Sequence, residues 1–286
     1  MNYQWYPGHM TKARRMMQDN MKLIDLIIEL VDARVPSSSR NPDIDTLGNG
    51  KSRLILLNKA DLADESCNHI WEDYFKGCGY TVVTVNSKTG SGVKSIYGAI
   101  QEACKEKIAR DRKRGILNRP VRAMVVGIPN VGKSTFINTL AGKACTKTGN
   151  KPGVTKGKQW IRLNKNVELL DTPGILWPRF ESPKVGLRLA MIGSMNDEIL
   201  DVEELAGELI VYLRRIKPGI LTGRYGILED GTVYEVLEKI AEARHCLLKG
   251  DKKDVHKAAA ILMDEYRNGK LGRVTLELPA EEGEQD

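Results

Sequence analysis

The sequence predicts an α/β fold with a mainly parallel sheet, followed by a small all-helical domain. Up to about residue 180, short apolar runs that end in polar residues alternate with helical patterns, as in a parallel α/β sheet. After Pro183 the β-branched runs stop, and apolar residues recur at helical spacing. We therefore expect an α/β domain over 1–180 with an N-terminal helical extension over 1–22, and a helical domain over 181–276.

The apolar runs predict six strands, and the helical patterns predict four clear helices. The expected strands are 26–31, 54–57, 81–85, 123–126, 159–163 and 167–170. The expected helices are 11–21, 205–216, 233–248 and one that begins after the N-cap Asp254 and stops at Asn268-Gly269. Ligand chemistry is expected just past the carboxyl ends of the strands.

Length and composition favour a cytoplasmic protein with a buried core in each domain. The chain has 286 residues, 41% of them hydrophobic, and its N-terminus has no signal-peptide or transit character. No window is apolar enough to span a membrane, so no membrane partner is expected. The five cysteines form no CxxC pair, which argues against zinc and a disulfide framework.

The charge distribution suggests a polyanionic partner, although a solvated surface gives the same count. The net charge is +7 and the pI is near 9.0. Between Lys105 and Arg122 there are eight basic residues against two acidic ones. The last residues, 277–286, contain five acids and no base, and are expected to form a frayed acidic tail.

The strongest motif is GIPNVGKS at 127–134, which fits GxxxxGK[ST] between an expected strand and an expected helix. In such a phosphate loop, backbone N–H groups surround the phosphates, Lys133 adds a positive charge and Ser134 offers a hydroxyl to Mg²⁺. A plain glycine turn between strand and helix is the weaker alternative. The nucleotide-binding residues expected here are Asn130, Val131, Gly132, Lys133, Ser134 and Thr135.

Two shorter motifs follow the phosphate loop. Asp171 begins DTPG directly after an expected strand, where a carboxylate can hold magnesium and Gly174 can sense the γ-phosphate. Upstream, Thr155 lies in the loop KPGVT and is expected to close over the same metal. The magnesium ligands expected are thus Ser134, Thr155 and Asp171.

A guanine-reading motif precedes the phosphate loop. In NKAD at 58–61, Asp61 can accept from guanine N1–H and the exocyclic amine, which adenine lacks. Asn58 is expected to support the opposite edge, and the stem of Lys59 to pack on the ring. One strand later, Asn86 and Ser87 stand where related GTPases carry Ser-Ala before a lysine.

This motif order resembles the circularly permuted GTPases, because ordinary GTPases carry the guanine reader after the phosphate loop. The resemblance implies a Ras-like P-loop GTPase sheet that binds GTP or GDP with Mg²⁺. Within that group, YPGHM at 6–10, DARVP at 32–36 and DTPGILWP at 171–178 resemble the ribosome biogenesis GTPase A family. The resemblance covers the GTPase domain closely and the helical domain only in size and type.

The resemblance implies a bacterial factor in late maturation of the large (50S) ribosomal subunit that is released on GTP hydrolysis. Its partners would be the large-subunit precursor and its rRNA, with no DNA. The helical domain would be an RNA-binding domain that contacts phosphates, although any single lysine there can equally be a solvated side chain. The basic residues concerned are Arg214, Arg215, Lys217, Lys249, Lys252 and Lys253.

Two further roles are hypotheses. Ras-like enzymes place a water-orienting Gln after DxxG, but here that position is Ile175, so His9 of the PGHM motif is the candidate catalytic residue. A structural histidine that orders the turn is the alternative. Asn130 resembles the residue that holds K⁺ in potassium-activated GTPases, and a loop-shaping asparagine is its alternative. Without a glutamine, we expect slow hydrolysis that K⁺ and the large subunit stimulate.

Rival functional interpretations are a nucleotide-gated RNA scaffold without significant hydrolysis and an ATP-dependent enzyme. The complete phosphate and metal motifs favour an enzyme, and Asn58 and Asp61 oppose ATP. The segment after Gly174 leads directly into the helical domain, so nucleotide state is expected to reorient that domain.

Overall fold

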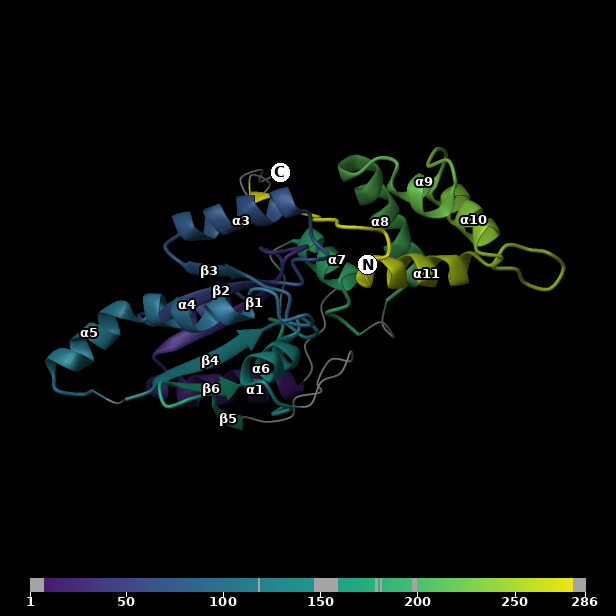
Figure 1. Ribbon diagram of the computed structural model, residues 1–286. Coiled ribbons are helices and arrows are strands. Elements are labelled where there is room, and N and C mark those ends of the chain that lie inside the picture. Colours follow the sequence, from purple (N-terminus) through teal and green to yellow (C-terminus); the bar gives the residue numbers. More distant parts are fainter. Residues whose placement is uncertain are drawn as a thin grey trace.

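The computed structural model describes residues 8–117, 119–146, 159–177, 180, 182–196 and 200–279. Figure 1 shows a sheet with helices on both faces and a separate group of helices at one end. The strands are β1 (Leu26–Asp32), β2 (Ser52–Asn58), β3 (Thr81–Thr84), β4 (Val121–Gly127), β5 (Gln159–Arg162) and β6 (Val167–Asp171). The helices of the sheet domain are α1 (Gly8–Asn20), α2 (Asp43–Leu47), α3 (Glu65–Gly77), α4 (Ile96–Ala103), α5 (Lys105–Lys113) and α6 (Lys133–Ala141), with 3-10 turns η1 (Met21–Leu23) and η2 (Val93–Ser95). The remaining helices are α7 (Pro183–Met191), α8 (Val202–Ile216), α9 (Ile220–Tyr225), α10 (Val233–Ala243) and α11 (Val255–Arg267).

The six strands form one sheet in the order β3-β2-β1-β4-β6-β5. All neighbouring strands are parallel except β5, which runs antiparallel to β6 at the sheet edge. The predicted α/β architecture and its six strands are therefore confirmed. The carboxyl ends of β1, β2, β4 and β6 meet at one edge, which is where ligands bind in such folds.

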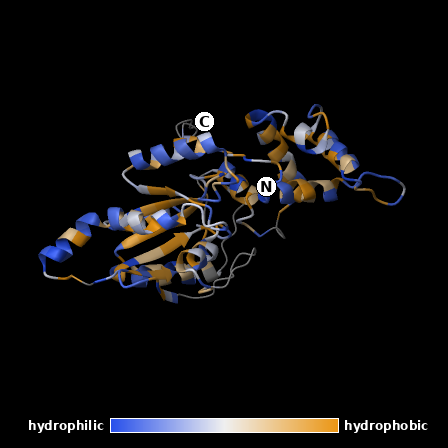
Figure 2. Cartoon of the chain, in the orientation of Figure 1, coloured by the Kyte–Doolittle hydropathy of each residue, from blue (hydrophilic) through white to orange (hydrophobic). Residues whose placement is uncertain are grey.

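The strands are apolar because both faces of the sheet are covered. Figure 2 shows hydrophobic strands surrounded by helices with hydrophilic outer surfaces. Successive strand residues point to opposite faces, so β2 contributes to two cores. Ile55 belongs to a buried cluster with Trp71 and Phe75 of α3. Leu54 and Leu56 belong to the main core, to which α1, α4 and α6 also contribute.

The helical part is built around contacts of α8 with α10 and α11. The expected N-cap of α11 is confirmed, because Asp254 Oδ1 accepts from the backbone N of Lys257 at 2.9 Å. The helix expected over 233–248 ends earlier, at Ala243. His245 has a φ of 52°, and this left-handed backbone turns the chain out of the helix. No helix among the described residues is long and apolar enough to cross a membrane.

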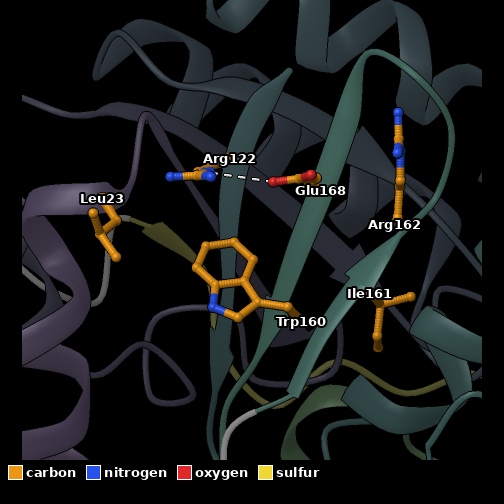
Figure 3. A pocket seen from close by; sticks show the side chains of 6 residues that line it. All are labelled: Leu23, Arg122, Trp160, Ile161, Arg162 and Glu168. Carbon is orange, nitrogen blue, oxygen red and sulfur yellow. Dashed lines mark hydrogen bonds and ion pairs between the residues drawn. The ribbon is translucent and has the colours of Figure 1, made fainter. Parts of the chain in front are cut away.

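A hollow of about 340 Å³ lies at the β5 edge of the sheet (Figure 3). It is lined by Leu23, Arg122, Trp160, Ile161, Arg162 and Glu168. The hollow extends from Arg122 and Glu168, near the starts of β4 and β6, to Trp160, which pairs with Leu170 near the end of β6.

The chain after α11 returns to the sheet domain instead of staying with the helices. The backbone N–H groups of Val274 and Leu276 donate to the carbonyl oxygens of Leu62 and Arg34 at 2.9 and 2.8 Å. Figure 1 shows this segment running from α11 to the end of α3. The expected helical domain of 181–276 therefore includes a final segment that packs on the GTPase-like sheet domain.

The acidic tail expected over 277–286 does not begin at Glu277, because this residue is buried. Its side chain is 3% exposed, and it accepts hydrogen bonds from the backbone N and the hydroxyl of Ser38. Arg188 Nη1 donates to the same carboxylate at 2.8 Å. Burial raises the pKa of Glu277, and the Arg188 charge opposes that rise. Glu277 is thus a buried anchor; composition alone had grouped it with a solvated tail.

We predict that Glu277→Ala lowers the free energy of unfolding by about 3 kcal/mol, because it removes one partner of a buried ion pair. Urea titration followed by circular dichroism measures the change. Glu208→Ala on α8, where the side chain is exposed, is the matched control and should leave the stability unchanged within about 0.5 kcal/mol. Equal stabilities of the two variants would contradict the anchoring role of Glu277.

Candidate nucleotide-binding site

Three motif-bearing segments meet at the carboxyl edge of the sheet. β2 ends at Asn58, β4 ends at Gly127 and β6 ends at Asp171. Both β2 and β4 pair in parallel with β1, and β6 pairs in parallel with β4. The segments that carry the expected guanine, phosphate and metal residues therefore leave the sheet side by side.

Asn58 connects the guanine-reading loop to the phosphate loop. Its side chain is 1% exposed, and its Nδ2 donates to the carbonyl oxygen of Val131 at 2.8 Å. Its Oδ1 accepts from the backbone N and the hydroxyl of Ser87, at 3.0 and 2.8 Å. A Cβ at Gly132 would lie 2.5 Å from Asn58 Nδ2, so only glycine allows the loops to approach this closely. One amide thus fixes three segments of the site.

Lys133 brings a positive charge into the phosphate loop. It is the first residue of α6 and is 7% exposed. Its Nζ donates to the carbonyl oxygens of Gly127 and Ile128 at 2.9 and 3.0 Å, so the ammonium lies within the loop. Burial lowers the pKa of Lys133 to about 8, and the Asp171 charge opposes that fall. A buried ammonium at a helix N-terminus is suited to bind an anion such as a phosphate group.

Asp171 has the character of a metal ligand. Its side chain is 1% exposed, and neither carboxylate oxygen has a hydrogen-bond partner among the described residues. Burial raises the pKa of Asp171 to about 6, because the ionised form lacks solvation there. Mg²⁺ prefers oxygen ligands and keeps several waters, so this carboxylate fits direct or water-mediated magnesium binding. Ser134 lies in the first turn of α6, next to Lys133.

Gly174 packs against the phosphate loop from the other side. A Cβ there would lie 2.8 Å from Lys133 Nζ and 2.9 Å from backbone atoms of Pro129, so the DxxG segment touches the loop directly. The backbone N of Ile175 donates to the Gly127 carbonyl oxygen at 3.4 Å, and its side chain is buried. This contact places the expected γ-phosphate sensor beside Lys133, the lysine expected to bind phosphate.

The remaining predicted site residues are only partly described. Asp61 is exposed just beyond the end of β2, and Thr135 is half-buried on α6. Asn86 Oδ1 accepts from the backbone N of Lys88 at 2.9 Å, so this side chain shapes its own loop. Thr155 lies outside the described residues. His9 is in the first turn of α1, and its side chain lies outside the described part.

Comparisons with known proteins agree with this geometry. A family described as "50S ribosome-binding GTPase" matches residues 122–248. The chain is similar to ribosome biogenesis GTPase A of Bacillus cereus, with 47% identity over 283 residues that cover 99% of this chain and 96% of that protein. It is also 34% identical to ribosome biogenesis GTPase A of Thermotoga maritima, over 96% of this chain and 94% of that protein. The chain belongs to the ribosome biogenesis GTPase A family.

Solved structures show the same fold. YlqF of Thermotoga maritima in its GNP-bound form gives a TM-score of 0.69 at 30% identity, covering 94% of this chain and 98% of that one. The GDP-bound form gives a TM-score of 0.69 at 29% identity, covering 93% of this chain and 100% of that one.

Membership of the ribosome biogenesis GTPase A family makes this chain a GTP-binding and GTP-hydrolysing protein. A non-catalytic scaffold is not favoured.

In this ribosome biogenesis GTPase A protein, Lys59 is held by Asp32, which in turn pairs with Arg34, and the sequence analysis placed neither residue in the site. Lys59 Nζ donates to Asp32 Oδ2 at 2.9 Å, and Arg34 forms a two-pronged pair with the same carboxylate at 2.9 and 2.8 Å. Burial opposes ionisation, but Arg34 and Lys59 hold the pKa of Asp32 below its usual range. Asp32 ends β1 opposite Asn58, and this position at a strand end was the available signal.

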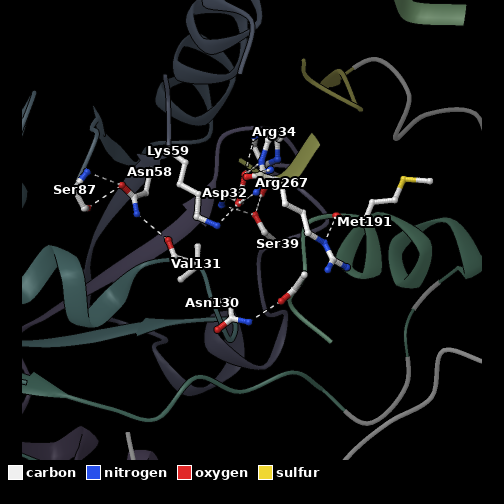
Figure 4. Close-up of polar contacts among 12 residues, drawn as sticks. Asp32, Arg34, Ser39, Asn58, Lys59, Ser87, Asn130, Val131, Met191 and Arg267 are labelled. Carbon is white, nitrogen blue, oxygen red and sulfur yellow. Dashed lines mark hydrogen bonds and ion pairs between the residues drawn. The ribbon is translucent and has the colours of Figure 1, made fainter. Parts of the chain in front are cut away.

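The same network reaches the helical part, as Figure 4 shows. Arg34 Nη1 donates to the carbonyl oxygen of Arg267 at 3.3 Å, at the end of α11. Arg267 Nε in turn donates to the Met191 carbonyl oxygen at 3.1 Å, at the end of α7. From the phosphate loop, Asn130 Nδ2 donates to the Gly193 carbonyl oxygen at 2.7 Å. Both nucleotide loops thus contact the junction between the sheet domain and the helices.

We predict that Asp171→Asn stabilises the nucleotide-free protein but removes the effect of Mg²⁺ on nucleotide binding. Removing a buried charge without hydrogen-bond partners should raise the free energy of unfolding by about 1–3 kcal/mol. Thermal unfolding with GDP, measured with and without Mg²⁺, shows whether the magnesium-dependent shift is lost.

Asp73→Asn, at an exposed position on α3, is the control and should retain the wild-type Mg²⁺ response. An undiminished Mg²⁺-dependent shift in Asp171→Asn would remove Asp171 from the metal site.

Proposed function

We propose that this chain is a GTP-hydrolysing assembly factor for late maturation of the large (50S) ribosomal subunit, released when GTP is hydrolysed. The observation that carries the proposal is similarity over nearly the full length to proteins named ribosome biogenesis GTPase A, 47% identical in Bacillus cereus. The assembled edge of the sheet supports it, because the guanine, phosphate and metal motifs are in mutual contact there. Its site of action would be the cytoplasm.

In this proposal Mg²⁺ is held by Ser134, Asp171 and Thr155, and supplies positive charge to the phosphates. Asp171 would bind the ion through an otherwise unpartnered carboxylate. Lys133 would exchange its two carbonyl acceptors for phosphate oxygens, and Asp61 would read the guanine edge. The stem of Lys59, fixed at its ammonium end by Asp32, would cover the base.

Ribosomal RNA of the large-subunit precursor is the proposed partner of the helical domain. Lys249 and Lys252 are exposed between α10 and α11 and are available for phosphate contact. Lys217 is less suitable, because its Nζ donates to the Arg273 carbonyl oxygen at 2.6 Å and pairs with Asp64 at 3.3 Å. Lys217 instead ties the end of α8 to the segment that follows the guanine-reading loop.

GTP turnover with and without immature large subunits tests the function. In K⁺ buffer, the subunits should increase turnover by about tenfold or more, which corresponds to roughly 1.4 kcal/mol of transition-state stabilisation. Mature small subunits at the same concentration serve as the control. Turnover that no large-subunit preparation increases would contradict a role on this particle.

His9→Ala should lower kcat by about a hundredfold and leave GDP affinity within about twofold of wild type. The reason is that Ile175 is apolar and buried, so another group must orient the attacking water. His69→Ala, at an exposed position on α3, is the matched control. Unchanged kcat, or a parallel loss of GDP affinity, would assign His9 a structural role.

Turnover should be faster in K⁺ than in Na⁺, because the Asn130 amide oxygen is proposed to hold K⁺ beside the phosphates, where its charge stabilises the transition state. Asn130→Ala should remove this difference. The comparison uses chloride salts at equal ionic strength. Equal wild-type rates in the two salts would exclude the K⁺ role.

A further inference from the structure

An exposed tryptophan lies on the edge strand of the sheet, where it pairs with Leu170 of β6. Trp160 on β5 is 38% exposed and lines the hollow of about 340 Å³. Figure 3 shows the Trp160 indole and, to one side of it, Leu23, both among the side chains that line the hollow. Leu23 is 45% exposed. The hollow therefore combines exposed apolar surface with charged side chains, and its volume leaves room for one nucleobase; we call it the slot.

Two arginines border this slot. The Arg122 guanidinium lies 5.5 Å from the Trp160 ring centroid, and its Nε donates to Glu168 Oε2 at 3.1 Å. Arg162 is opposite Glu168 in the β5–β6 register. Glu168 on β6 therefore has an arginine as its register partner on each neighbouring strand, Arg122 on β4 and Arg162 on β5. The net charge beside the indole stays positive.

Helix α5 continues the positive surface away from the protein body. Figure 1 shows it at the opposite end of the molecule from α8–α11, and Figure 2 shows it as largely hydrophilic. Four of its terminal side chains are exposed and form no ion pair with any described residue. They are Arg110, Arg112, Lys113 and Arg114. The acidic Glu102 and Glu106 near its start are outnumbered by these four cations.

Ion pairs join α5 to the two chain segments that lead into the hollow. Asp25 pairs with Lys107 of α5 at 3.2 Å and with Arg119 at 3.3 Å, which neutralises this acid. Asp25 lies two residues after Leu23, and Arg119 lies three residues before Arg122. The two residues that make this ion pair are therefore close in sequence to two residues that line the hollow. We call Leu23, Arg122, Trp160, Arg162 and α5 together the α5–Trp160 surface.

We propose that the α5–Trp160 surface binds single-stranded RNA, with one base stacked on Trp160 and the backbone phosphates on the arginines of α5. A cationic track beside an exposed aromatic ring is the combination by which proteins hold single strands. RNA is the occupant we favour, because each nucleotide carries both a base that can stack on the indole and a phosphate that can meet a guanidinium, whereas an acidic protein would match mainly the charge of α5. The identification of the RNA as ribosomal rests on the proposed function.

The hollow contains none of the described phosphate or metal residues. Arg122 and Glu168 are near the starts of β4 and β6, and Trp160, although it pairs with Leu170 just before Asp171, is on the edge strand β5. RNA and GTP can therefore bind simultaneously. The surface also lies on the sheet domain, so it is distinct from any RNA contact made by the helical domain.

Fluorescence anisotropy with a labelled, unstructured RNA of about ten nucleotides tests the proposal on the GDP-bound protein. Trp160→Ala should weaken binding by about tenfold, whereas Trp160→Phe, which keeps a stacking ring, should stay within about threefold of wild type. The double variant R112E/R114E should reduce the slope of log K against log salt by roughly 0.7 per lost phosphate contact. Unaided GTP turnover should be unchanged in all three.

Lys76→Glu is the control for a change of surface charge elsewhere, because it lies on α3 at the far side of the sheet and changes the net charge in the same sense, by half as much as R112E/R114E. Wild-type RNA affinity in Trp160→Ala would overturn the proposal, as would an equal loss in Lys76→Glu. Equally effective competition by polyglutamate would also overturn it and indicate an acidic protein partner.

The test separates this surface from the proposed function. If large subunits stimulate wild-type GTP turnover while the three variants bind RNA normally, only the α5–Trp160 surface is refuted. If subunits give no stimulation while Trp160→Ala and R112E/R114E bind RNA more weakly and Trp160→Phe retains binding, the surface stands and the ribosomal assignment is refuted.

Discussion

The nucleotide site depends on one buried amide. Asn58 binds the Val131 carbonyl oxygen with its Nδ2 and Ser87 with its Oδ1, so a single side chain sets the distance between the guanine-reading and phosphate-binding loops. In this chain those loops are on separate strands, β2 and β4, with β1 between them in the sheet. The contact is desolvated, and leaving either end unpaired costs about 1–3 kcal/mol. Gly132 permits the contact because a Cβ would collide with the amide.

A second constraint joins this site to the helices. Asp32 and Arg34 form a buried ion pair that holds Lys59 on one side and reaches Arg267 of α11 on the other. Asn130 contacts the same junction through Gly193. A group that displaces Asn130 or Lys59 must therefore alter contacts with the helical part. These side-chain contacts are a physical route by which nucleotide state can affect the helical domain. They add to the direct chain connection after Gly174.

Local patterns in the sequence were sufficient for the strands and the motifs. The apolar runs identified all six strands, and the motifs at their ends identified the loops that meet at the sheet edge. Long-range pairings were not predictable, because neither partner carries a local signal for the other. The contact between Arg34 and Arg267 joins residues 233 positions apart. Glu277 was assigned to a solvated tail for the same reason, since only its distant partners show that it is buried. Thr155 and the His9 side chain lie outside the described residues, so their roles stay predictions.

Hydrogen–deuterium exchange in Asn58→Ala tests most directly whether one amide holds the two loops together. With GDP bound, amide exchange should accelerate in both the phosphate loop, 127–135, and the loop around Ser87, while the core strands stay protected. Wild-type exchange in the phosphate loop, with acceleration confined to the Ser87 loop, would contradict the account.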